Sequence, residues 1–421
     1  MSQPTRILLS LVAGLALGVL LAGQAPGAVP GVLLASEPIG TAWLNALQMT
    51  IVPLVVSLLV TGIAATAQAV RAGRIAARAI ALILTIMSLS AILAALLTPL
   101  LLELVPLPAA SAARLRAALI GIPAAAPPPG LSAFFTSLVP TNVVAAAANS
   151  AFLSLIIFTL LFAFALTRIE PARRAALTGF FEGLRDTVLV MVNWIIWAAP
   201  VGVFALALTV GAKAGSAAFG ALVHYIVTVS AVGVVVTLLA YPVAMIGGRI
   251  GLVRFARAAL PAQAVAVSTQ SSLASLPMML KKAEDLGVSA ATGGVVLPLA
   301  VVMMRATGPA MNLAVAIYVA TWFGTPIGPA TLAAATVVAM LTSLGSVSLP
   351  GQVSFISAIA PINAVFGVPV APLGLLVAVE TLPDIVRTLG NVTMDLAVTT
   401  AVSARSGAAP KDSADALLAA P

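Results

Sequence analysis

The chain has 421 residues, of which 61% are hydrophobic and only 8% charged, and its mean hydropathy is +1.17. This composition excludes an ordinary soluble domain and is typical of a protein whose helices cross a membrane several times. The chain has no cysteine and one histidine, His224, so it lacks residues for thiolate or histidine metal sites and for Ser-His or Cys-His catalysis, and we do not expect an enzyme.

Six apolar stretches in the first part of the chain predict helices, at 7–23, 41–68, 76–103, 131–167 (continuous or broken), 186–211 and 217–246. The second and third are each long enough to cross a hydrocarbon layer about 30 Å thick. A loop rich in Gly and Pro follows the first helix, and residues 104–131, rich in Ala and Pro, predict an external loop or a partly ordered insert.

The net charge of +8 reflects membrane topology rather than a nucleic-acid partner. Most basic residues of the first part fall in expected loops on one side of the spans: Arg6, Arg71, Arg74, Arg78, Arg168, Arg173, Arg174, Arg185, Arg249, Arg254 and Arg257. By the positive-inside rule this side is cytoplasmic. We therefore expect a multi-pass protein of the inner (plasma) membrane, in contact with lipid, with both termini in the cytoplasm.

The second part is apolar but interrupted by many prolines and glycines, and Arg305 is the only charged residue between Asp285 and Glu380. Backbone that is not helical is tolerated at membrane depth only when it is buried in protein or lines a cavity. Two polar interruptions, Ser268–Pro277 and Thr342–Gly351, predict re-entrant helical hairpins, because paired interrupted segments mark the binding sites of transporters. The alternative is two ordinary kinked spans.

A polar stripe follows, near the C-terminal end of the apolar region. Asp384, Arg387, Thr388, Asn391 and Asp395 lie at offsets 0, +3, +4, +7 and +11, which places them on one side of a helix, with Glu380 one turn earlier. Ionisable groups at membrane depth are costly and usually line a path for a solute or an ion. The alternative is a structural ion pair between Asp384 and Arg387 and nothing more.

These pieces together resemble the glutamate transporter homologue family, the dicarboxylate/amino acid:cation symporters. The likeness runs over most of the chain, and it rests on five segments: Met49–Ile63, Val139–Asn149, Ala199–Phe204, Leu349-Pro-Gly351 and Asp384-x-x-Arg-Thr-x-x-Asn-Val-Thr-x-Asp395. The resemblance implies an all-α polytopic membrane protein with eight transmembrane helices and two re-entrant helical hairpins in an inverted-repeat fold. It also implies a homotrimer and an elevator-type alternating-access mechanism.

The resemblance divides the chain into three parts. Residues 1–252 would hold six helices, of which 1, 2, 4 and 5 form a scaffold while 3 and 6 belong to a mobile transport domain. Residues 253–404 would form the core of that domain, with hairpin 1, helix 7, hairpin 2 and helix 8. Residues 405–421 are expected to be a disordered tail.

The resemblance also assigns roles to individual residues. Arg387 would clamp an acidic side chain of the substrate, Asp384 would bind its ammonium group, and Asn391 its α-carboxylate. The substrate-binding set is Arg387, Asp384, Asn391, Thr388, Ser271, Ser272, Leu349, Pro350, Gly351 and Arg305. Asp395, together with Asn391, is the candidate sodium site.

One segment departs from the family pattern. Where the family has Asn-Met-Asp-Gly-Thr at the unwound centre of its seventh helix, this chain has Met304-Arg-Ala-Thr-Gly308. A fixed positive charge at Arg305 would repel a cation bound nearby. One hypothesis is that Arg305 permanently neutralises Asp395 or Asp384 and that at least one sodium site is lost. The other is that Arg305 is a second clamp for the anionic substrate, with Thr307 brought into the site by a one-residue shift.

The functional prediction is therefore a symporter for acidic amino acids (aspartate, glutamate) or dicarboxylates, with no organic cofactor. Coupling to protons, coupling to fewer sodium ions, and no coupling all remain open. Asp384 favours an amino acid, but an Arg305–Asp384 pair would block the ammonium site and favour a dicarboxylate. The alternatives from other classes are an uncoupled facilitator or anion channel of the same fold and a membrane receptor that does not transport.

Overall fold

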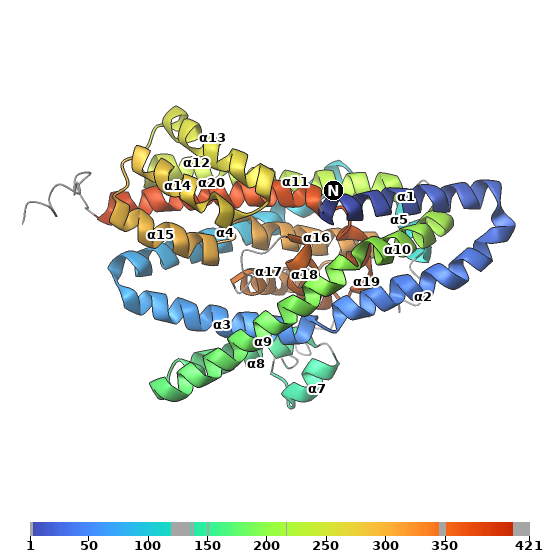
Figure 1. Ribbon diagram of the computed structural model, residues 1–421, viewed down its shortest axis with the longest axis horizontal. Helices are drawn as coiled ribbons and strands as arrows, with labels where there is room; N and C mark the ends of the chain where they lie inside the picture. Colours follow the sequence, from blue (N-terminus) through green and yellow to red (C-terminus); the bar gives the residue numbers. More distant parts are fainter. Residues whose placement is uncertain are drawn as a thin grey trace, which may run out of the picture.

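The computed structural model describes residues 3–118, 136, 139–149, 151–215, 217–344 and 351–406. Within these ranges every regular element is a helix, so the predicted all-α class is confirmed. Five helical segments are long and apolar enough to cross a membrane, or six if the bent pair α9 (Pro171–Trp197) and α10 (Ala199–Ala214) is one span. Most long helices run along the long axis of the molecule, and α9–α10 crosses them obliquely (Figure 1).

The helices of the first part follow the predicted order. They are α1 (Gln3–Gln24), η1 (Pro26–Ala28), α2 (Val29–Gln48), α3 (Ile51–Ala72), α4 (Arg74–Leu104), α5 (Ala109–Ala118), α7 (Val143–Ala148), α8 (Phe152–Leu166), α9, α10, α11 (Ala217–Leu238), α12 (Ala240–Pro242) and η2 (Val243–Gly247). The fourth predicted helix is broken between α7 and α8, which was one of the two alternatives.

Three expectations for this part are corrected by the structure. The loop expected after residue 23 is mostly helix, because α2 begins at Val29 with proline in its first turn, where a missing N–H costs nothing. The expected loop around Arg173 and Arg185 is also helix, since α9 begins at Pro171. The stretches 41–68 and 186–211, each expected as one helix, are divided, the first between α2 and α3 and the second between α9 and α10. The described part of the insert at 104–131 contains the helix α5, which agrees with a partly ordered insert.

Close backbone approach holds α1 against α10. A methyl group at Gly211 would lie 2.5 Å from the carbonyl oxygen of Leu15, so only glycine allows the two helices to touch here. Glu37 of α2 adds an ion pair with Lys213 of α10, with Nζ 2.5 Å from Oε1. The helices α1, α2 and α10 therefore form one packed unit.

The second part of the chain consists of helices joined by short breaks. They are α13 (Leu252–Thr269), α14 (Ser272–Asp285), α15 (Ala290–Met303), α16 (Thr307–Phe323), α17 (Pro329–Leu344), α18 (Gly351–Phe366), α19 (Ala371–Leu376) and α20 (Thr381–Ser406). The helix α16 is central, because all residues from Thr307 to Ala320 are buried and α4, α11, α17, α18 and α20 pack around it. This arrangement brings the helix breaks together in the interior.

The first predicted hairpin corresponds to α13 and α14, which pack on each other and are joined by two residues (Figure 1). Gln270 has a φ of 51°, in the left-handed region, and this turns the chain. The hydroxyl of Ser271 then accepts a hydrogen bond from the amide of Ala274 at 3.2 Å and caps α14. The polar residues of this turn are thus needed both for the turn and for the start of the helix.

The second predicted hairpin corresponds to α17 and α18, which also pack on each other. The tip between them, with Leu349 and Pro350, lies outside the described residues, and Gly351 is the first residue of α18. The roles expected for these three residues therefore remain predictions, as does the number of eight transmembrane helices with two re-entrant hairpins.

Candidate functional site: a buried cluster of charges

Five charged side chains are buried in the described part of the chain, and they gather at one place: Arg305, Glu380, Asp384, Arg387 and Asp395. Arg305 is in the break between α15 and α16, Glu380 is in the turn before α20, and the other three are on α20. The cluster consists of three carboxyl groups and two guanidinium groups. Burial of charges is costly unless they are paired, so this cluster is the place to look for function.

Arg387 is the centre of the cluster. Its Nη2 donates to Oε1 of Glu380 at 2.6 Å, and its Nη1 donates to Oδ1 of Asn312 on α16 at 2.9 Å. Its Nε lies 3.4 Å from Oδ1 of Asp384, an ion pair without a hydrogen bond. The expected Asp384–Arg387 pair is thus present, but the shorter contact is with Glu380.

Glu380 is held from its other side by a tyrosine. The hydroxyl of Tyr225 on α11 donates to Oε2 of Glu380 at 2.9 Å, and the carboxylate has 0% of its side chain exposed. Two partners on two different helices therefore fix both carboxylate oxygens.

Arg305 is 9% exposed and lies where charges of both signs act on it. Asp384 is the carboxylate that acts most strongly on it, and Asp395 acts on it more weakly, while Arg387 repels it. Of the two carboxylates expected to be neutralised by Arg305, the arrangement favours Asp384. A pair between Arg305 and Asp384 is the case in which the sequence predicts a blocked ammonium site.

Thr307, the first residue of α16, fixes the orientation of Asn391. Its backbone N–H donates to Oδ1 of Asn391 at 3.1 Å and its hydroxyl lies 2.8 Å from the same atom. A backbone N–H can only donate, so this atom of Asn391 must be the oxygen. With Oδ1 occupied by two donors, Asn391 presents its amide hydrogens to the site, which suits an anion better than a cation.

Asp395 is different from the other carboxylates. Its side chain is fully buried, and among the described residues neither of its oxygens has a hydrogen-bond partner. A buried carboxylate with free lone pairs suits a cation or a proton. The neighbouring positions that the family uses for sodium are Met304 and Ala306 here, and their side chains offer no oxygen. Among the side chains of Met304, Ala306 and Asp395, only that of Asp395 offers oxygens to a cation.

Two narrow hollows adjoin the cluster, and Arg305 and Arg387 line both. The first is lined by Gln270, Ser271, Ser272, Arg305, Asp384, Arg387, Thr388 and Asn391. It brings the turn of the first hairpin next to the polar stripe of α20, so seven residues of the predicted substrate-binding set line the same hollow. The second lies toward α18, and its lining includes Ser354 and Asn312. Two guanidinium groups beside a helix N-terminus favour an anion.

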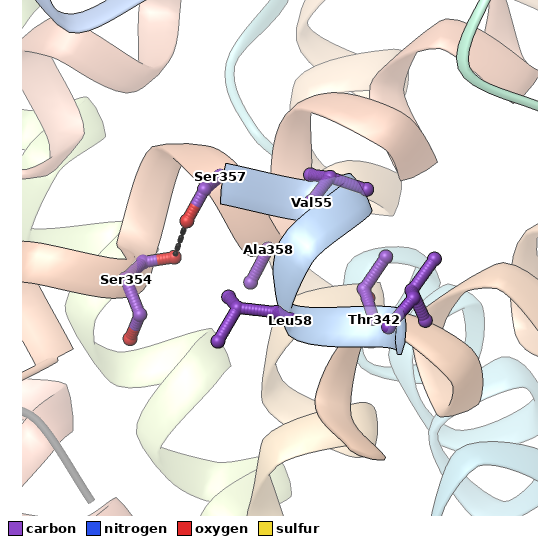
Figure 2. Close-up of a pocket in the computed structure, with 7 residues that line it drawn as sticks. Val55, Leu58, Thr342, Ser354, Ser357 and Ala358 are labelled. Carbon is purple, nitrogen blue, oxygen red and sulfur yellow. Dashed lines mark hydrogen bonds between the residues drawn. The ribbon is translucent and has the colours of Figure 1, made fainter. Parts of the chain in front are cut away.

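A third hollow lies against α3, and Figure 2 shows the residues that line it. It lies between Val55 and Leu58 of α3 and Thr342, Ser354 and Ala358 of α17 and α18. The hydroxyl of Ser357 bonds to the carbonyl oxygen of Ser354 at 3.1 Å within the helix. Ser354 and Ala358 line both hollows, so these two residues of α18 lie between the charged cluster and the apolar surface of α3.

Sequence reasoning missed three of the side chains that build this site. Tyr225 and Asn312 belong to apolar helices with no motif around them, and Ser354 lies just beyond the second polar interruption. The spacing places Glu380 on the polar stripe, but the sequence does not predict a partner for it. The only sequence signal for these residues is that each is a polar residue within an apolar stretch. Such a signal does not specify which residue it contacts.

Comparison with known proteins completes this description. The model of the sodium:dicarboxylate symporter family matches residues 4–405. The chain is 27% identical to the proton/glutamate-aspartate symporter of Escherichia coli (strain K12), over 92% of this chain and 89% of the relative. It is 28% identical to a C4-dicarboxylate transport protein of Rhizobium johnstonii, over 95% and 89%. A C4-dicarboxylate transport protein of Anaeromyxobacter sp. (strain K) is 27% identical, over 98% and 94%.

Proposed function

Because the chain belongs to the sodium:dicarboxylate symporter family, we propose that it is a secondary active transporter that carries a small dicarboxylate in preference to an acidic amino acid. The family consists of transporters rather than enzymes, and the protein is a multi-pass membrane protein. Its similar relatives include both C4-dicarboxylate and glutamate-aspartate transporters, so family membership alone does not choose between the two substrates.

The position of Arg305 supports the dicarboxylate. An amino acid needs a carboxylate for its ammonium group, and Asp384 is the residue available for that role. Asp384 already faces two guanidinium groups, since Arg387 lies 3.4 Å away and Arg305 acts on it from the helix break. A substrate without an ammonium group does not compete with these arginines, and its two carboxylates can be bound by them.

Arg305 also supports a change in the ions that drive transport, compared with the family pattern. It supplies a fixed positive charge near Asp384 and Asp395, and the side chains of Met304 and Ala306 offer no oxygen to a cation. A sodium ion brought to the same poorly solvated space would be repelled by Arg305. The proposal is that at least one sodium site has been replaced by Arg305, so that transport is independent of sodium or uses fewer sodium ions, with protons as the alternative coupling ion.

The mechanism proposed is of the elevator type, with α1, α2, α3, α7, α8, α9 and α10 as the scaffold. The mobile part would consist of α4, α11 and the helices from α13 to α20. All side chains of the charged cluster and its hydrogen-bond partners come from this second group, which would allow the site to move as one body. Large apolar side chains on the first group, such as Trp194, Trp197 and Leu34, are exposed and would face lipid or other subunits of a homotrimer. An inner-membrane location with both termini in the cytoplasm is part of the same proposal.

The deciding experiment is uptake into liposomes that contain the purified protein. Labelled succinate and labelled aspartate are offered under a sodium gradient and, separately, under a proton gradient. We expect succinate to accumulate more than aspartate and sodium to have little effect. Accumulation of aspartate driven by sodium would contradict both the substrate and the role of Arg305. Equilibration without accumulation would favour a facilitator or anion channel, and binding without uptake would favour a receptor.

A matched variant tests Arg305 directly. In R305M the residue has the side chain that the family pattern carries at this position. If Arg305 stands in for a cation, the variant should gain a dependence on sodium or lose uptake that sodium partly restores. An unchanged response to sodium in R305M would contradict the idea. R254K, on an exposed residue that bonds to the carbonyl oxygen of Asp285, serves as the control for a change of arginine elsewhere.

A further inference from the structure

The contact between Glu380 and Arg387 occupies the group that a dicarboxylate needs. Arg387 has an acceptor or carboxylate at each of its three nitrogens, namely Glu380 at Nη2, Asn312 at Nη1 and Asp384 near Nε. The shortest of these contacts, 2.6 Å, joins Nη2 of Arg387 to Oε1 of Glu380. A substrate carboxylate can pair with Arg387 only by sharing it with Glu380 or by replacing it.

The net charge of the cluster makes it unfavourable for an ionised Glu380 and a substrate carboxylate to share Arg387. The five buried side chains carry three negative and two positive charges when all are ionised, which leaves one negative charge. A dianionic substrate would raise this to three negative charges in a closed interior, where unpaired charges are strongly unfavourable. The loaded site therefore requires positive charge from elsewhere.

From this geometry we propose that Glu380 is the group that binds a proton when the substrate is bound. In the empty site the ionised carboxylate pairs with Arg387. When a substrate carboxylate takes its place at Nη2, one proton binds to Oε1 of Glu380, while Oε2 keeps the hydrogen bond from Tyr225. When the substrate leaves, Glu380 loses this proton and its carboxylate pairs with Arg387 again. Each cycle thus carries one proton with the substrate through this residue. The inference rests on the proposed transport of dicarboxylates.

The surroundings of Glu380 fit this role. The titratable groups that face it are Tyr225 from α11 and Asp384 and Arg387 from α20. Behind Tyr225 lies Tyr318 of α16, with the two ring centres 5.4 Å apart. The Tyr225 hydroxyl holds Oε2 in place whether or not the other oxygen carries a proton, so the neutral side chain keeps its position. Tyr225 is in this respect a positioning residue.

Polar side chains continue from Tyr318 toward the end of α4. The Tyr318 hydroxyl donates to the carbonyl oxygen of Ala221 at 2.8 Å and lies 3.2 Å from Nδ1 of His224. Nε2 of His224, a partly exposed residue, lies 2.7 Å from the carbonyl oxygen of Val105 just after α4. These groups place polar atoms between the buried carboxylate and the end of a membrane helix, in a region that is otherwise apolar.

The test uses the full chain in liposomes and labelled succinate, and it compares wild type, E380Q and the control E103Q. Glu103 is exposed at the end of α4, so E103Q makes the same chemical change outside the site. Two rates are measured: accumulation under an inward proton gradient, and exchange of internal for external succinate without any gradient. One coupled proton allows about tenfold accumulation for each unit of pH difference.

We expect wild type and E103Q to accumulate succinate in response to the proton gradient. E380Q, whose neutral amide resembles the protonated carboxyl group, should exchange succinate but lose the proton-driven accumulation. Its affinity for succinate, measured by thermal stabilisation at several pH values, should follow only the ionisation of succinate itself, whereas the affinity of wild type should show an additional dependence on pH. Y225F should retain coupling with its pH dependence displaced, which a purely structural role of Tyr225 would not produce.

The outcomes separate this inference from the proposed function. Proton-driven accumulation by E380Q equal to wild type overturns the inference, as does transport by wild type that ignores the proton gradient, and both leave the transporter in place. Loss of both exchange and binding in E380Q also overturns it, because a neutral residue 380 is the state assigned to the loaded site. If wild type transports neither succinate nor aspartate, the proposed function itself fails.

Discussion

Thr307 donates twice to one oxygen of Asn391, from its backbone nitrogen at 3.1 Å and from its hydroxyl at 2.8 Å. The first residue of α16 is thereby fastened to the middle of α20, 84 positions later in the chain. The hydroxyl also lies 2.9 Å from the carbonyl oxygen of Arg387. This single threonine joins the helix break that carries Arg305 to the helix that carries Arg387.

Replacement of Thr307 tests this connection. T307V keeps the volume and loses the hydroxyl, which leaves two buried oxygens with one donor fewer. We expect unfolding in detergent to need about 1–3 kcal/mol less free energy and the affinity for succinate to fall, while T307S behaves as wild type. T336V, which loses only a hydroxyl bonded within α17, is the control and should change stability by less than about 0.5 kcal/mol. Equal effects of T307V and T336V would contradict the connection.

Double-mutant cycles can identify the partner of Arg305. The cycle of R305M with D384N and the cycle of R305M with D395N each give a coupling energy from the stabilities of four proteins. We expect the Asp384 cycle to show coupling of about 1–3 kcal/mol and the Asp395 cycle to show less, because Asp384 acts more strongly on Arg305. A larger coupling with Asp395 would reverse the assignment and make Asp384 available to an ammonium group.

The shape of the Arg387 side chain should matter as much as its charge. R387K keeps one positive charge but loses the planar fork that contacts Glu380 and Asn312 at the same time. We expect kcat/KM for succinate to fall about 100-fold, the equivalent of ~2.7 kcal/mol. R254K on the exposed end of α13 should leave it unchanged. Wild-type uptake by R387K would mean that a point charge is sufficient and would contradict bidentate recognition.

Gly390 should tolerate no side chain. A methyl group at this position of α20 would meet the hydroxyl of Thr237 on α11 and would lie 2.5 Å from the methyl carbon of Thr307. G390A should therefore cost about 1–3 kcal/mol of stability through overpacking. G179A on α9 has open space around it and should be neutral or slightly stabilising, because alanine is the better helix former. Thermal unfolding of both variants checks the prediction, and equal stability would contradict it.

Much of the architecture could be predicted from local patterns. Apolar stretches located α1, α4 and the segment from α11 to η2 to within a few residues, because crossing a membrane needs a minimum apolar length. The offsets of Asp384, Arg387 and Asn391 placed them on one side of α20, since helical periodicity depends only on spacing. Family membership followed from the same segments and is confirmed by the match over residues 4–405. Local patterns failed where a helix is rich in charge, as at the start of α9, where the sequence predicts a loop and the structure has a helix.

The partners within the site were decided by tertiary structure alone. Glu380 and Asp384 are seven and three residues before Arg387, so both lie on its side of the stripe and spacing cannot choose between them. The choice depends on Tyr225 and Asn312, which arrive from helices α11 and α16 and hold Glu380 and Arg387 together. Such contacts form when distant segments pack around α16, and the free energy of a buried charge depends on that packing. For this reason the chain's own spacing was sufficient to locate the charged stripe, while the pairing of its charges required the folded molecule.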